Sequence, residues 1–377
     1  GEEESLFKGI IIRHGLRVYS RKPSVLKIEC KDAAVKLTVG RKNAYFYEST
    51  DSEIIETIAG AAGLEKDVET TNTTHPEMVQ FYATDWDFIL TRAEANGKLV
   101  TTRQGKLIVK TPDAGGEPVL AMVYGQDMLE FEALMDARDQ YDKVESFAWQ
   151  AADQQMLQIE GSAPATVSPG NVTESDLAAV IGLDTLQLKH GGQIKDDELQ
   201  AWSDGQLLKS SFSKVRGRAR IQGFGSIGPG DIIELAGVGD RFNGRALVSA
   251  VHHQITLKNW ETEIFFGLSP EWFGAEEKRV VDASANGLLP GISGLHIGLV
   301  SALEGDPDGE DRIQVRIPMI DPDEQGVWAR VASLDAGENR GAFFRPEIGD
   351  EVVLGFLNDD PRNPVVVGML NSSAKPA

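Results

Sequence analysis

The chain has 377 residues, of which 41% are apolar and 7% aromatic, and its formal net charge is −21 at pH 7. Single hydrophobic cores rarely grow beyond about 250 to 300 residues, so this length predicts two or three domains. The negative charge argues against binding nucleic acid or anionic lipid by general electrostatics. The sequence contains no run of about 18 uncharged apolar residues that could cross a bilayer. Cys30 is the only cysteine, which excludes an intrachain disulfide and a cysteine zinc cluster.

The first 49 residues read as part of a β-rich domain. The run "LFKGIIIRHGLRVYS" is apolar and β-branched, and "AAVKLTVG" alternates with the period of a strand. Because the first run looks like the middle of a sheet, residues 1–49 are expected to lack the first strands of this domain. The acidic start at 1–5 has neither the basic flank nor the apolar core of a signal peptide, so we expect synthesis in the cytoplasm.

Two helices are predicted in an insertion domain at 50–120. Thr50 and Glu53 have the spacing of a capping box ahead of an apolar stripe with helical period. Thr84 caps a second helix of the same kind. Strands are expected to follow at 98–102 and 105–111.

Residues 121–165 are expected to contain further strands. A stretch rich in Ser, Pro, Gly and Asn, from 161 to 175, then interrupts the pattern. It introduces a predicted helical segment that covers 166–213 with interruptions.

The two-residue period returns at 214–275, which predicts a second tube-like antiparallel barrel. In "KVRGRARIQG", small and apolar residues point to one face and Arg216, Arg218 and Arg220 to the other. Because carboxylates outnumber basic residues in the chain, we expect these arginines to pair across a subunit interface or to line a lumen rather than to bind phosphate. The same strand, 214–222, is expected to be an open edge that a neighbouring subunit covers.

A linker is predicted at 276–292, followed by a small all-β domain at 293–372. Five short strands separated by Gly, Asp and Pro turns fit a Greek-key barrel of the oligonucleotide/oligosaccharide-binding (OB) type. The sequence thus predicts a mainly β fold with helical insertions. The barrel interior is expected to contain Val315, Val331, Val352, Leu354 and Val366.

The segment "WARVASLDAGENRGAFFRPEIGDEVVLGFLNDDPRNPVVVGML" resembles the VgrG family of spike proteins. Upstream, "TDWDFILTRAEANGKLV" and "GFGSIGPGDIIELAGVGDRFNGRALVSAVHH" look like the phage-hub region of that family. In the OB segment, Trp328 has the size to plug one barrel end, and the remaining motif residues form turns and strand starts. The motif residues are Trp328, Arg330, Pro346, Gly349, Asp350, Asp360, Pro361, Arg362 and Pro364.

This resemblance implies a structural hub and spike subunit of a contractile injection system. In such a family member, a homotrimer with two tube-like barrels per subunit would join a sixfold tail tube to a threefold spike. The resemblance implies that residues 1–49 form a partial first barrel without its N-terminal strands, that 121–165 return to this barrel as strands, and that 214–275 form the second barrel. The implied partners are further copies of the chain, tail-tube and baseplate proteins, a spike tip protein and effectors, without nucleic acid and without stable membrane insertion before firing. The resemblance also implies expulsion from the cell on firing, and a β-helix needle after the barrel, of which this sequence holds none.

No catalytic, cofactor-binding or metal-binding residue is predicted. His252 and His253 are adjacent on a predicted strand, where neighbouring side chains point to opposite faces and do not chelate one ion. Carboxylate clusters such as "KDDEL" and "DPDGED" lie in turn-like contexts and read as solvated loops. Two alternatives remain: a peptidoglycan-degrading spike enzyme, or a module that binds sugar or nucleic acid on the OB face. The second would use Trp328, Phe343, Phe344 and Phe356.

Overall fold

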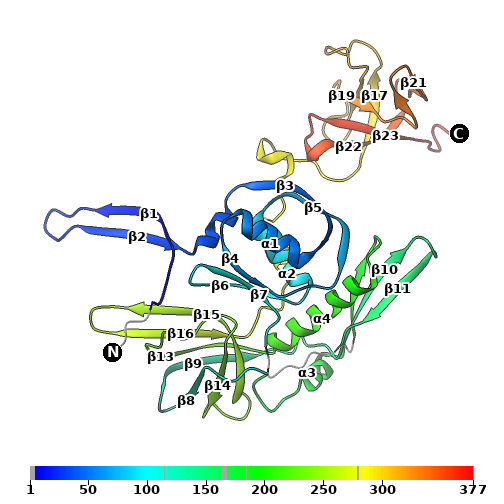
Figure 1. Ribbon diagram of the computed structural model, residues 1–377. Helices are drawn as coiled ribbons and strands as arrows, with labels where there is room; N and C mark the ends of the chain where they lie inside the picture. The colour runs from blue at the N-terminus through cyan, green and yellow to red at the C-terminus, as the bar shows by residue number, and fades with distance from the viewer. Residues whose placement is uncertain (1–4, 114, 163–167, 184, 278–279, 377) are drawn as a thin grey trace. The chain divides into compact units, whose positions relative to one another are not determined.

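The computed structural model describes residues 5–113, 115–162, 168–183, 185–277 and 280–376. The chain divides into two compact units, Gly1–Val280 and Val281–Ala377 (Figure 1). The boundary falls inside the linker predicted at 276–292. Among the described residues, no helix is both long and apolar enough to span a membrane.

The first unit begins with a β-hairpin of β1 (Ile10–Arg17) and β2 (Val25–Lys31). The two strands form a sheet of their own, and the 3-10 helix η1 (Ala33–Thr38) follows them. The next strand, β3 (Arg41–Thr50), pairs with β5 (Thr74–Thr84) of the insertion. The expected partial barrel at 1–49 is therefore wrong, because the apolar inner face of β3 packs on the insertion core through Phe46.

The insertion packs two helices against short sheets. Helix α1 (Asp51–Ala61) begins with the predicted capping box, in which Thr50 accepts from the Glu53 backbone, and Thr84 caps α2 (Asp85–Ala95) by accepting from Asp87. A three-stranded sheet in the order β4-β7-β6 lies beside them. Its strands are β4 (Glu65–Val68), β6 (Leu99–Arg103) and β7 (Lys106–Lys110). The core of this insertion includes Leu37, Ile54, Ile55, Ile89, Leu107 and Val109.

A six-stranded sheet in the order β8-β14-β15-β16-β13-β9 forms the second part of the first unit. The expected return of 121–165 to a first barrel is wrong, since β8 pairs with β14 and β9 pairs with β13. Non-local pairing thus unites this segment with the predicted second barrel in one open sheet. The strands are β8 (Leu120–Val123), β9 (Met128–Met135), β13 (Val215–Gln222), β14 (Ile232–Ala236), β15 (Gly244–Ile255) and β16 (Trp260–Phe266).

Two helices and a three-stranded sheet complete the first unit. The predicted helical segment 166–213 contains α3 (Glu174–Ile181) and α4 (Asp196–Ser213), and its interruption is the strand β12 (Thr185–His190). β12 pairs in parallel with β10, whose other neighbour is β11. The remaining elements of this unit are β10 (Lys143–Gln150), β11 (Gln155–Glu160) and α5 (Phe273–Glu276).

The second unit contains a closed barrel in the order β17-β18-β19-β23-β22, which confirms the predicted five-stranded architecture. Val315, Val352, Leu354 and Val366 are buried in it as expected, and Val331 packs against them while partly buried. The barrel strands are β17 (His296–Ala302), β18 (Ile313–Arg316), β19 (Val327–Val331), β22 (Glu351–Phe356) and β23 (Pro364–Leu370). The minor elements are η2 (Ser284–Gly287), β20 (Ala336–Gly337), β21 (Arg340–Gly341) and η3 (Leu357–Asp359).

Candidate assembly surfaces

The predicted arginine face exists on β13. Val215, Ala219 and Ile221 are buried on one side of this strand, and the arginines lie on the other. Arg218 donates to Glu263 at 2.8 Å and to Glu132 at 3.0 Å. These contacts cross to both neighbouring strands, because Glu132 lies on β9 and Glu263 on β16. The hydrogen bond with Glu132, followed by the one with Glu263, raises the pKa of the Arg218 guanidinium.

The other two arginines also have partners within the chain. Arg220 contacts Glu130 at 2.9 Å and Glu261 at 3.3 Å. Arg216 lies 3.5 Å from Asp136, whose pKa falls to about 2, chiefly through the side-chain hydrogen bond from Arg138. Acidic side chains of the same chain thus neutralise the charge of the arginine face. An inter-subunit role for these arginines stays a prediction.

The expectation that β13 is an open edge is wrong. β13 pairs with β16 on one side and with β9 on the other over most of its length. The edge of the sheet at this end is β9, whose outer side forms only an isolated bridge from Met128 to Tyr124 in the described part of the chain. Alternation predicted which residues share a face, but it does not determine which strand is outermost.

Several OB motif residues lie in turns of the barrel. Asp350 accepts from the Glu347 backbone at 2.7 Å, and Gly349 has a φ of 82°, which favours glycine. Asp360 accepts from the Arg362 backbone at 2.9 Å and from its guanidinium. The Arg362 side chain, followed by its backbone N–H, lowers the pKa of Asp360 to about 2. Pro364 begins β23.

Trp328 does not plug the barrel. It is partly buried, and the fully buried position of β19 is its neighbour Ala329. Adjacent strand residues point to opposite faces, so Trp328 shares the outer face with the exposed Arg330. The side chains that line the barrel core are Val300, Ile313, Val315, Ile317, Ala329, Val352, Leu354 and Val366.

The turn from Asp306 to Gly309 contains a dense cluster of polar contacts. The sequence predicted the turn but not these contacts. Asp306 accepts from the Arg312 guanidinium at 2.6 Å and from the backbone N–H groups of Glu310 and Arg312. The Arg312 side chain holds the pKa of Asp306 far below its usual range. This cluster fixes the loop ahead of β18.

A groove of about 530 Å³ lies beside β20 and β21. The exposed Phe343 and Phe344 border it, as the sugar or nucleic-acid alternative would require. However, Arg340 bonds to Asp335, and Arg345 bonds to Asp311. A third arginine, Arg330, also borders the groove, but the three carboxylates of Glu310, Asp311 and Asp335 balance the three arginines, so the groove presents little net positive charge to a phosphate.

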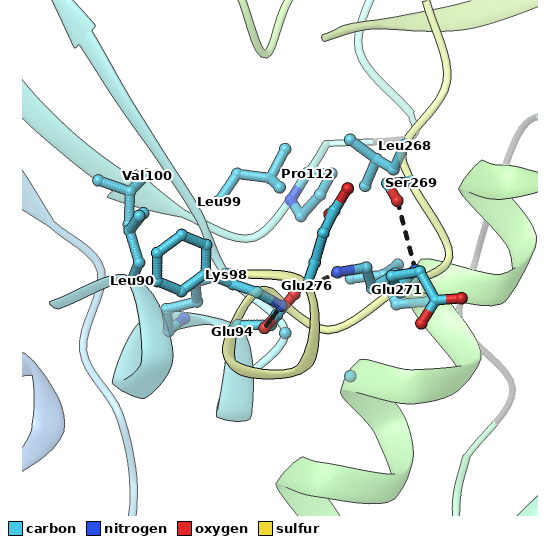
Figure 2. A pocket seen from close by; sticks show the side chains of 15 residues that line it. Leu90, Glu94, Lys98, Leu99, Val100, Pro112, Leu268, Ser269, Glu271 and Glu276 are labelled. Carbon is cyan, nitrogen blue, oxygen red and sulfur yellow. Dashed lines mark hydrogen bonds and ion pairs between the residues drawn. The ribbon is translucent and has the colours of Figure 1, made fainter. Parts of the chain in front are cut away.

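A second pocket, of about 270 Å³, lies between α2, α4 and the segment before α5 (Figure 2). Apolar side chains including Leu90, Leu99 and Leu268 line it. Its charged residues are largely paired, since Lys209 bonds to Glu94 and Lys98 donates to Glu69 at 2.7 Å. We interpret this pocket as a gap in the packing between these elements and not as a catalytic or binding site.

A buried polar network joins α1, β5, α2 and α4. Asp51 is 1% exposed and accepts hydrogen bonds from Arg92 and, at 2.9 Å, from Asn96. Its Oδ2 atom also lies 3.1 Å from Nε2 of His75. Burial raises the pKa of Asp51, but the hydrogen bond and charge of Arg92 outweigh it and lower the pKa overall. Arg92 also donates to Glu198 at 3.0 Å. No local pattern in the sequence indicates this network, because its hydrogen bonds join residues up to 106 positions apart.

The histidine pair does not converge on one site. His252 lies 3.7 Å from Glu263 on the charged face, whereas His253 contacts Thr262 at 3.0 Å. In the part of the chain that the structure describes, no group of three or more His, Cys, Asp or Glu residues has a geometry that could hold a metal ion.

Comparison with known proteins matches each unit to a described domain family. A family model described as the Alg8 N-terminal domain matches residues 1–257. A model described as the Type VI secretion system/phage-baseplate injector OB domain matches residues 296–370. The chain is 26% identical to Type VI secretion system spike protein VgrG1b of Pseudomonas aeruginosa over 193 residues, which are 47% of this chain and 25% of VgrG1b.

Two further matches agree with this. VgrG1a of the same organism is 27% identical over 190 residues, 47% of this chain and 29% of VgrG1a, so the matched part spans little more than a quarter of these relatives. A tail protein from Neisseria meningitidis MC58 shares the fold, with a TM-score of 0.52 at 12% identity over 70% of this chain and 80% of that protein. The chain belongs to the Alg8 N-terminal domain family and, with the injector-type OB domain that follows, to the VgrG family of spike proteins.

Proposed function

We propose that this chain is a structural hub and spike-base subunit of a contractile injection system. The observation that carries the proposal is the combination of two units in one chain: a hub-like unit with the fold of a phage-type tail protein, and a closed OB barrel that matches the injector OB domain. In this role the chain acts as a trimer, with the first unit below the sixfold tail tube and the OB barrel at the base of the threefold spike.

The role is mechanical and not catalytic. Hydrogen-bonded sheets and a closed barrel resist deformation because each strand is tied to its neighbours, which suits a part that transmits the thrust of contraction. The partners of this subunit are further copies of itself, tail-tube and baseplate proteins, a spike tip protein and effectors. It is made in the cytoplasm, built into the apparatus and expelled on firing.

A gene deletion in the bacterium of origin tests the proposal. Without the gene, we expect no assembled sheathed particles in electron micrographs, and expression of the full-length gene should restore them. Normal particles in the deletion strain would refute the role. For the non-catalytic part, a gel containing peptidoglycan should show no clearing by the purified protein, and clearing would support the enzyme alternative.

A further inference from the structure

The β1–β2 hairpin differs in charge from the rest of the molecule. Between residues 8 and 31 there are seven Lys or Arg and one Glu, a net charge of 7 − 1 = +6, in a chain of −21. All other residues together therefore carry −21 − 6 = −27. A segment of this kind is attracted to the remainder of another copy of the same chain.

The register of the hairpin gives it two different faces. Leu16 pairs with Leu26, His14 with Ile28 and Ile11 with Cys30, so these side chains share one face. The opposite face carries the Arg17–Val25, Gly15–Lys27 and Arg13–Glu29 pairs. The hairpin is thus an amphipathic ribbon with an apolar face and a basic face.

The apolar face of the hairpin is uncovered. Leu16 is 71% exposed, Leu26 60% and Ile11 54%. In the described part of the chain, β1 and β2 pair only with each other, which leaves two free backbone edges. An isolated two-stranded hairpin is at best marginally stable in water, and free edges invite pairing with another strand.

The edge strand β9 has the matching features. It has eight residues, as β1 has, and it carries Glu130 and Glu132 without any Lys or Arg. Those glutamates lie on the charged face of the six-stranded sheet, while Phe131, Ala133 and Met135 pack against its apolar core. Its outer edge is unpaired beyond the bridge at Met128, among the residues described.

We propose that the β1–β2 hairpin of one copy adds to the β9 edge of a neighbouring copy. Edge-to-edge pairing continues both faces of the sheet at once: the apolar face of the hairpin extends the side of Phe131 and Ala133, and its basic face meets Glu130 and Glu132. Backbone hydrogen bonds across the new edge supply affinity, and the side-chain match fixes which face is which. The two surfaces differ, so the contact is head-to-tail and closes into a ring of copies.

The inference rests on the proposed self-assembly and names its interface. It also gives the arginines of β13 a positioning role, since Arg218 and Arg220 hold Glu132 and Glu130 along β9. Attraction between a basic ribbon and an acidic edge weakens with ionic strength, because the Debye length falls from about 10 Å at 0.1 M to about 3 Å at 1 M salt.

Cys30 offers a direct probe, because it is the only cysteine and lies exposed on the apolar face of the hairpin. Two differently tagged copies of the full chain are co-expressed, one with Cys30 and one with C30S and a new cysteine on β9. We expect a short bismaleimide to join the copies when the second carries A133C, which lies on the apolar side. The matched control is L134C, which lies on the charged side of the same strand and should give little product.

A second variant tests the contact without a new cysteine. Because Leu16 and Leu26 are exposed in the single chain, L16S/L26S should leave its circular dichroism unchanged while light scattering shows loss of the oligomer. L257S, at a fully exposed turn position, should keep the wild-type mass.

The outcomes separate this inference from the proposed function. A trimer that forms equally well with L16S/L26S, or that cross-links no better through A133C than through L134C, overturns the hairpin contact and leaves the hub role intact. Selective cross-linking in dimers or open filaments, without a trimer, supports the contact and contradicts the trimeric hub. A wild-type chain that stays monomeric at its highest soluble concentration overturns the contact as well.

Discussion

Arg92 and Asp51 form a two-point ion pair between α2 and α1, with Nε–Oδ1 at 2.6 Å and Nη2–Oδ2 at 2.9 Å. The pair is almost wholly buried, since the side chain of Asp51 is 1% exposed and that of Arg92 17%. Arg92 also donates a hydrogen bond to Glu198 and so connects the insertion to α4. The pair therefore connects two parts of the first unit that are distant in sequence.

Removing one partner of this pair should destabilise the first unit. Asp51→Asn leaves the buried guanidinium of Arg92 without its main carboxylate, and breaking a buried pair in this way costs about 3 to 5 kcal/mol. Urea denaturation followed by hydrogen exchange of α1 and α2 peptides measures the loss. Glu56→Gln, on an exposed face of α1, is the control and should change the free energy of unfolding by less than about 0.5 kcal/mol. Equal stability of D51N and wild type would contradict the assignment.

The OB barrel should lose stability in acid through Asp360. Its pKa is about 2 in the folded barrel against an ordinary value of 3.8. A carboxyl with a depressed folded pKa contributes stability above its unfolded pKa, and this contribution falls as the pH drops from about 4 to about 2. Hydrogen exchange of peptides from β22 and β23 as a function of pH reports the change. D360N should flatten the dependence in this range, and an identical acid response of the variant would refute the role.

Truncating a core side chain should unfold the barrel more readily. Leu354 is fully buried at 0% exposure among the side chains that fill the barrel. Leu354→Ala should therefore cost about 2 to 5 kcal/mol of barrel stability through lost burial and a residual cavity. Val367→Ala, 51% exposed on β23, is the matched control. Similar denaturation midpoints for both variants would show that the barrel interior is assigned to the wrong face.

Local signals in the sequence predicted much of this fold. The capping box of Thr50 and Glu53 is a contact over three residues, so the sequence alone determines where α1 begins. Alternation over short strands placed Val352 and Leu354 inside the barrel, because the side-chain period of a strand is two. The OB motif added turn positions such as Gly349, whose positive φ restricts the residue type.

Features that depend on distant pairing could not be predicted. Alternation shows that β9 has a polar and an apolar face, but it does not show that β13 is its neighbour some 80 residues later. The size of Trp328 favoured an interior position, yet the barrel places the small Ala329 inside at that point. The Arg92–Glu198 contact likewise forms only once α2 and α4 are packed.

The final prediction concerns the arginine face of β13, where two sets of substitutions should affect the stability of the fold and the association of copies differently. Replacing Arg216, Arg218 and Arg220 together with Glu puts like charges opposite the glutamates of β9 and β16, and like charges directly opposite one another destabilise a sheet. We expect this variant to unfold at lower urea concentration than wild type and added salt to restore part of the loss, because salt screens exposed charges.

The matched variant replaces the same three arginines with Gln, which removes their charge without adding repulsion. We expect it to keep the circular dichroism of the wild type but to associate more weakly at low salt, since Glu130 and Glu132 lose the side chains that hold them along β9. Individual exposed pairs contribute only about 0 to 1 kcal/mol, so the change in association should be modest and should disappear at high salt. Light scattering across a salt series decides the matter. An unchanged mass for the Gln variant at every salt concentration would show that these arginines serve the sheet of their own chain alone.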